Sequence, residues 1–407
     1  MSVKQLRPFP SHFRLRDLTT VTDSVFELKV NPHQDAAARE TYAWFDRCNV
    51  YQGKMKKTFL SHRFDLYAAL SFPEADLKHL ETCIAFFLWT FSFDDLSDEG
   101  ALQNKPQAVQ TGVDISMEVL RNPDAPVPNF PYAVMLSDIW KTMRTTASTG
   151  ACNRFFRAVE SWMAAQVEQA TFRKLDEIPS VNDFIILRRR TIGARIVEAM
   201  VEYSLDLQIP EYVWDDPILQ EMSKAWIDIM TWPNDLCSFN KEQADDDFQN
   251  LVFCIMIEHD CDLQTAIDTL TDMLAQRVTD YVNLRAQLRS FGPDVDREVA
   301  RYTKAMEQYT QGTLVWYYHS PRYFRGQDVL NKPEIVVPVY ERTAPAEPEP
   351  EPAPSAPSAA PYKASPQGST LASAMLFALP RGLVAHQHLA SVLVCLVAVT
   401  GCMFALR

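Results

Sequence analysis

The 407-residue chain is poor in glycine, in basic charge and in paired cysteine. Only 11 residues are glycine, and because all-β folds need many glycine turns, this scarcity favours helices. None of the eight cysteines forms a CxxC pair, which argues against a zinc site or a disulfide framework. The net charge is −13 and no basic stripe offsets it, so nucleic acid is excluded as a partner and any phosphate group would need local cations.

The amino terminus lacks the apolar core of a signal peptide. Several cysteines lie within apolar helical runs, as reduced packing cysteines do in cytosolic proteins. These two features predict a cytoplasmic location for the globular part. Hydrophobic residues make up 47% of the chain, which is enough to bury a large core.

Composition divides the chain into three zones. Residues 1–335 are predicted to form one globular domain. Residues 336–370 are rich in Pro, Ala and Glu, and the eight prolines between positions 344 and 366 predict an extended, disordered linker. Residues 371–407 are apolar again and form a C-terminal tail.

Helical periodicity runs through most of the first zone, and alternating strand patterns are few and short. Proline and glycine breakers separate the apolar runs. The fold class is therefore all-α. The predicted helical runs are Leu77–Glu99, Arg154–Arg173, Val181–Tyr203, Ile218–Phe239, Asp262–Gln287 and Val295–Tyr318.

The tail contains 18 uncharged residues at positions 389–406. A helix of this length spans ~27 Å at ~1.5 Å per residue, which suffices for a thin bilayer. The run therefore fits a tail anchor that holds the globular part on an endomembrane. Its Ala, Ser and Thr content fits a packed C-terminal helix equally well.

An apolar helical stripe ends in three carboxylates between Phe86 and Gly100. Buried carboxylates are costly without a cation, and all-oxygen ligands favour a hard ion such as Mg²⁺. DDxxD alone is a weak pattern, and an acidic helix end facing water fits it too. The residues that share this face are Ile84, Phe87, Phe91, Asp94, Asp95 and Asp98.

A second candidate metal site follows Trp232. Asn234, Ser238 and Glu242 recur every four residues, so their oxygens can converge on one cation if the segment is helical. One carboxylate gives a site of low charge, which binds a cation well only when a phosphate supplies further oxygens. Lys241 is placed to meet that phosphate. The bland interpretation is a solvated polar helix face.

Together these motifs resemble the class I terpene synthases, in particular the fungal sesquiterpene synthases. Asp94–Asp98 is similar to the family's aspartate-rich motif, and Asn234–Glu242 is similar to its NSE motif. Arg188 lies 46 positions before Asn234, where the family keeps a diphosphate-sensing arginine. Arg322 and Tyr323 are similar to its C-terminal Arg-Tyr pair, and the likeness extends from about Phe59 to Arg325.

The resemblance implies a single-domain class I terpenoid synthase fold with a central active-site cavity. It implies three Mg²⁺ ions bound through the two motifs, and a prenyl diphosphate substrate. Arg189 and Arg190 follow Arg188 directly, so the diphosphate-sensing arginine could be a neighbour of the one assigned. The implied metal ligands are Asp94, Asp95, Asp98, Asn234, Ser238 and Glu242. The implied diphosphate donors are Arg188, Lys241, Arg322 and Tyr323. Surface ion pairing is the alternative for the arginines.

Catalysis in such a cavity would need ionisation at the diphosphate end and inert, electron-rich walls beyond it. Asp94 and Arg188 are assigned to ionisation. Aromatic faces stabilise a cation without attacking it, and Phe87, Phe91 and Trp316 are the candidates, with core packing as their alternative. The implied reaction is cyclisation of farnesyl diphosphate. The family members it most resembles point to 1,11 (humulyl, protoilludene-type) closure, while 1,10 and 1,6 closure stay open.

Three other functions are the alternatives to this one. A chain-elongating prenyltransferase would carry a second DDxxD motif, whereas this chain has NDxxSxxxE at that position. A class II cyclase would carry DxDD, which is absent. A prenyl diphosphate-binding helical protein that retains the scaffold without turnover is the non-enzymatic alternative, and the intact metal ligands argue against it.

Overall fold

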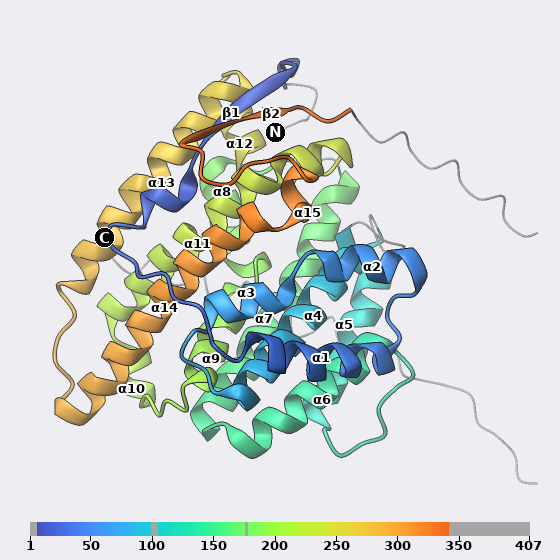
Figure 1. Cartoon of the computed structure of the whole chain (residues 1–407), viewed down its shortest axis with the longest axis vertical. Helices are drawn as coiled ribbons and strands as arrows, with labels where there is room; N and C mark the ends of the chain where they lie inside the picture. Colours follow the sequence, from blue (N-terminus) through green and yellow to red (C-terminus); the bar gives the residue numbers. More distant parts are fainter. Residues whose placement is uncertain (1–5, 99–104, 176–177, 342–407) are drawn as a thin grey trace, which may run out of the picture. The chain divides into compact units, whose positions relative to one another are not determined.

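Helices make up nearly all of the fold (Figure 1). The computed structural model describes residues 6–98, 105–175 and 178–341, all of which fall in one compact unit. The helices are α1 (Gln34–Cys48), α2 (Gly53–Ser61), α3 (Phe64–Ser71), α4 (Leu77–Asp98), α5 (Pro106–Arg121), α6 (Pro131–Thr146), α7 (Thr149–Leu175), α8 (Val181–Thr191), α9 (Ala194–Ser204), α10 (Glu211–Trp214), α11 (Pro217–Ala244), α12 (Leu251–Glu258), α13 (Leu263–Arg285), α14 (Pro293–His319) and α15 (Pro321–Phe324), with one 3₁₀ turn, η2 (Leu18–Val21).

Local sequence accounts for where the long helices begin. Helix α11 starts after Asp216, whose carboxylate accepts the backbone N–H groups of Ile218 and Leu219, and Pro217 occupies its first turn. Helix α13 starts in the same way after Asp262, which accepts the N–H of Thr265 at 2.8 Å. Five of the six predicted runs correspond to single helices, so the all-α class is confirmed.

The sixth predicted run, Val181–Tyr203, is wrong as a single helix. It is two helices, α8 and α9, separated by Ile192 and Gly193. Gly193 has φ 78°, a left-handed conformation that ends α8 and redirects the chain. The apolar period continues on both sides of the break, which is why periodicity alone did not reveal it.

A short antiparallel pair joins distant parts of the chain. Strand β1 (His12–Arg16) pairs with β2 (Glu334–Pro338), with Arg14 opposite Val336, and Figure 1 shows the pair beside α13. The predicted domain boundary after residue 335 falls inside β2. The folded part therefore continues beyond that boundary, at least as far as Glu341, the last described residue.

Helix α14 approaches α3 so closely that only glycine fits between them. A Cβ on Gly312 would lie 2.3 Å from the carbonyl oxygen of Leu70. We expect Gly312→Ala to lower the free energy of unfolding by about 2–3 kcal/mol or more, because backbone rather than a flexible side chain must move. Gly112→Ala in α5 is the matched control, since its Cβ would meet Phe130 and Phe93 at 3.8–3.9 Å. Urea unfolding should separate the two, and equal stability would contradict the packing.

The predicted tail anchor at positions 389–406 and the rest of the tail and linker beyond residue 341 lie outside the described residues. Within the described part of the chain, none of the helices combines the length and the apolar character needed to cross a bilayer. The anchor therefore stays a prediction from sequence.

Candidate active site

One large cavity opens among α3, α4, α7, α8, α9, α11, α14 and α15. Its empty volume is about 1120 Å³, part of which is open solvent at the mouth. Charged and polar groups from α4, α8, α11 and α15 share the lining with aromatic side chains from α3, α4 and α14. The cavity can therefore receive a molecule with an anionic head and an apolar body.

The α11 face supplies three of its polar groups. Asn234, Ser238 and Glu242 all line the cavity, as their four-residue spacing requires. The hydroxyl oxygen of Ser238 is buried and has no hydrogen-bond partner within the described part of the structure. Burial, reinforced by the Asp247 carboxylate, raises the pKa of Glu242 to about 7. An orphaned hydroxyl beside a carboxylate that lacks a full counter-charge fits a hard cation.

The α4 side contributes differently from the prediction. Asp94 lines the cavity, and one of its oxygens accepts a hydrogen bond from Gln166 Nε2 at 3.4 Å. Asp95 is instead paired with Arg322, Nη2 to Oδ1 at 2.6 Å, and is not among the lining residues described. Asp98 ends α4, and its side chain lies outside the described residues.

No three His, Cys, Asp or Glu side chains converge on a single point in the described residues. Asn234 and Ser238 add an amide and a hydroxyl oxygen to the cavity beside the single carboxylate of Glu242. This agrees with the low-charge site expected from the Asn-Ser-Glu spacing.

Arg188 is the arginine of its run that reaches the cavity. Its Nε donates to Asp235 Oδ1 at 2.9 Å, and its Nη2 donates to Asn234 Oδ1 at 2.7 Å. Burial by itself would lower the pKa of Arg188, but the carboxylates of Asp235, Glu242 and Asp94 together hold it above its usual value. The guanidinium therefore stays charged at the polar end of the cavity.

The two neighbours of Arg188 point elsewhere. Arg189 makes a bidentate pair with Asp228, both bonds at 2.7 Å, and Arg190 pairs with Glu168 at 2.8 Å. Neither lines the cavity in the described structure. The sequence could not tell which of these three adjacent arginines faces the site, and the geometry selects Arg188.

Charges in the lining are balanced. The described lining contains four cationic side chains, Arg173, Arg188, Lys241 and Arg322, and four acidic ones, Asp94, Glu242, Asp245 and Asp247. A polyanion entering this cavity would find no surplus of positive charge from the protein. With all eight groups ionised, the lining therefore offers an anion no net positive charge.

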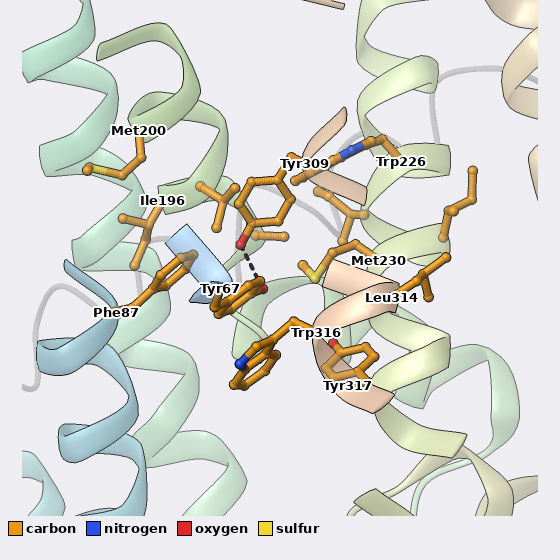
Figure 2. Close-up of a cluster of buried hydrophobic side chains, with 14 of the residues drawn as sticks. Tyr67, Phe87, Ile196, Met200, Trp226, Met230, Tyr309, Leu314, Trp316 and Tyr317 are labelled. Carbon is orange, nitrogen blue, oxygen red and sulfur yellow. Dashed lines mark hydrogen bonds between the residues drawn. The ribbon is translucent and has the colours of Figure 1, made fainter. Parts of the chain in front are cut away.

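Stacked rings form the apolar wall (Figure 2). The ring of Tyr67 lies between Phe87, at 4.0 Å, and Trp316, at 4.1 Å, with interplanar angles of 5° and 7°. Its hydroxyl hydrogen-bonds the Tyr309 hydroxyl at 2.9 Å. Phe87, Phe91, Tyr67 and Tyr309 line the cavity.

Trp316 does not belong to the described lining, contrary to the expectation that its face borders the cavity. The residue is fully buried behind Tyr67, and its indole N–H donates to the backbone carbonyl of His62 at 2.9 Å. This bond ties the ring to the turn between α2 and α3. Tyr67, the ring stacked on Trp316, lines the cavity in its place.

Comparison with known proteins decides the family. Residues 85–280, which contain both candidate metal motifs, match the family model described as Terpene synthase family 2, C-terminal metal binding. Sesquiterpene synthase Agr1 of Cyclocybe aegerita is 30% identical over 304 residues, covering 75% of this chain and 87% of that protein. The chain belongs to the terpene synthase family.

Further relatives support this membership. Delta(6)-protoilludene synthase of Armillaria gallica is 27% identical over 308 residues, covering 74% of this chain and 88% of that protein. The solved structure of germacradien-4-ol synthase from Streptomyces citricolor has a TM-score of 0.66 and 23% identity, covering 74% of this chain and 98% of that one. The fold is thus that of the class I terpenoid synthases, and this terpene synthase is a cyclase of the carbon–oxygen lyase class.

Some lining residues of this terpene synthase escaped the sequence analysis. Tyr67, Trp162, Arg173 and Tyr309 all reach the cavity, yet none lies in a motif with a recognisable spacing. Tyr309 lies about two turns before Trp316 on α14, so a helical projection from Trp316 would have found it. Tyr67 lies in an apolar segment where nothing distinguishes it from core.

Proposed function

We propose that this terpene synthase ionises (2E,6E)-farnesyl diphosphate and cyclises the resulting carbocation to a sesquiterpene. One observation carries the proposal: Asp94 of α4 and the Asn234, Ser238 and Glu242 set of α11 line the same cavity as an aromatic wall. A site of this kind joins a cation-binding end to a dry apolar end. An allylic diphosphate has the matching two halves.

The description of the matched family includes metal binding. We propose that the metal is Mg²⁺ and that three ions bind. Asp94 and Asp98 would hold two ions, and Asn234, Ser238 and Glu242 would hold the third. Bound Mg²⁺ would neutralise the negative charge that develops on the diphosphate as the C–O bond breaks. The charge-balanced lining described above supports the need for such ions.

The chain's own cations orient the leaving group. Arg188 and Lys241 project from α8 and α11, and Arg322 from α15, with Tyr323 beside it as a hydroxyl donor. Guanidinium groups bind phosphate oxygens in pairs and so fix their direction. The C1–O bond then breaks with its electron pair leaving on the diphosphate. The allylic cation stays in the cavity.

The aromatic wall governs the steps after ionisation. The faces of Phe87 and Phe91 each stabilise a passing cation by ~0.5–2 kcal/mol, and the wall as a whole excludes water that would quench it. A distal alkene of the farnesyl cation attacks C1 and closes a ring. Loss of a proton from the final cation then gives the hydrocarbon. The released diphosphate is the base available at the polar end. Trp316 supports this wall from behind Tyr67.

Substrate length and closure are inferred from the relatives. Agr1 is named as a sesquiterpene synthase, which supports the C15 substrate. The relative named as a protoilludene synthase supports 1,11 closure through a humulyl cation.

Incubation of the purified full chain with C10, C15 and C20 prenyl diphosphates tests the proposal. We expect cyclic sesquiterpenes from farnesyl diphosphate with Mg²⁺, and turnover reduced at least about 100-fold after chelation with EDTA, because the lining lacks surplus positive charge. Volatile products are identified by mass spectrometry, and restored turnover on adding Mg²⁺ back is the control. Cyclic products at an unchanged rate in EDTA, or only linear elongated diphosphates, would contradict it.

A further inference from the structure

The start of α12 contacts Glu242 and Asp235, two acidic residues of α11 at the polar end of the cavity. Asn250, which precedes the helix, is fully buried. Its side-chain Nδ2 donates to Glu242 Oε2 at 2.8 Å and to the backbone carbonyl of Asp235 at 2.7 Å. One amide group therefore links Glu242 to the α11 backbone almost two turns away.

The next residue completes the link. The backbone N–H of Leu251 donates to Asp235 Oδ2 at 3.2 Å, and the other oxygen of Asp235 accepts from Arg188. Asp235 is fully buried. The first residue of α12 thus helps to orient the carboxylate that holds the diphosphate-facing arginine.

Asn250 also has an ordinary structural task. Its Oδ1 accepts the N–H of Val252 at 2.9 Å and caps α12. Capping uses only this oxygen, and any good N-cap residue could supply it. The amide nitrogen is the part of Asn250 that capping does not need.

We propose that Asn250 is a positioning residue for the metal-binding carboxylate. Through Nδ2 it fixes Glu242 Oε2 and leaves the other oxygen of Glu242, which lines the cavity together with Ser238, for a cation. Hydrogen-bond partners behind a metal ligand commonly contribute a factor of 10–100 to metal affinity. Asn250 is outside the described lining, so it acts through Glu242 and not on the substrate. This inference rests on the proposed function.

Asn250→Ser removes the amide nitrogen but keeps an oxygen that can cap α12. Serine caps a helix about as well as asparagine, but its side chain is too short to reach Glu242 and the Asp235 carbonyl together. The measurement is Mn²⁺ binding in the presence of inorganic diphosphate, followed by the EPR signal of free Mn²⁺, with a thermal melt of each variant. Asp262→Ala, which removes the cap of α13 instead, is the control for a general loss of capping.

We expect Asn250→Ser to weaken Mn²⁺ binding at least about tenfold while the variant still unfolds cooperatively, at a somewhat lower temperature because two buried acceptors lose their donor, and Asp262→Ala to bind Mn²⁺ as the wild type does. Asn250→Thr, a second capping residue without the amide, should repeat the loss and replaces Asn250→Ser if that variant does not fold. Binding within twofold of wild type in the serine or threonine variant, or an equal loss in Asp262→Ala, would overturn the inference. A wild-type chain that binds no Mn²⁺ with diphosphate would contradict the proposed function itself.

Discussion

Replacing Asn234 and Ser238 together by alanine should lower kcat/KM for farnesyl diphosphate at least about 1000-fold, since even residues behind a metal ligand contribute about 10–100-fold. Both side chains line the cavity on one face of α11. The Ser238 hydroxyl makes no hydrogen bond within the described structure, so its loss costs the fold little. The measurement is steady-state turnover, with a thermal melt to show that the variant remains folded.

The matched control replaces one asparagine and one serine far from the α11 face. Asn283 on α13 and Ser161 on α7 are exposed, and their joint replacement by alanine should leave turnover unchanged. If the Asn234 and Ser238 double variant retains turnover within a few-fold of wild type, the α11 face does not bind the catalytic metal. Equal loss in both double variants would indicate a general effect on the fold.

Removing Arg188 should damage stability and turnover by separate routes. Arg188→Gln leaves the fully buried Asp235 carboxylate without its ion-pair partner, and breaking a buried pair in this way costs about 3–5 kcal/mol of unfolding free energy. Turnover should fall because a donor to the leaving diphosphate is lost. Urea unfolding and steady-state kinetics measure the two effects independently.

A second substitution separates them. Adding Asp235→Asn to Arg188→Gln removes the orphaned charge, so most of the lost stability should return. Turnover should remain at least about 100-fold below wild type, as expected for a lost transition-state donor. Recovery of turnover together with stability would contradict a role for Arg188 at the diphosphate and leave it a structural ion pair.

Local sequence predicted much of the fold because long helices carry their own signals. The apolar period and the caps of α11 and α13 come from residues close together in the chain. The β1–β2 pair was not predictable, since its partners are more than 300 residues apart and each strand has five residues. The break at Gly193 was missed because the apolar period continues across it.

The candidate site shows the same division. Asn234, Ser238 and Glu242 share a helix face through fixed four-residue steps, so their common exposure to the cavity followed from spacing. Tyr67 depends on how α3 packs against α14, which spacing does not encode. Asp95 and Trp316 were predicted to line the cavity because residues next to them in the sequence do so. Asp95 instead pairs with Arg322, and the Trp316 indole donates to the His62 carbonyl.

Anomalous diffraction from crystals grown with Mn²⁺ and inorganic diphosphate tests the central claim most directly. We expect a Mn²⁺ peak in contact with the side-chain oxygens of Asn234, Ser238 and Glu242, further Mn²⁺ at Asp94, and a diphosphate between them that contacts Arg188. Mn²⁺ bound only at sites outside this cavity, with Asn234 and Ser238 making no metal contact, would contradict the claim.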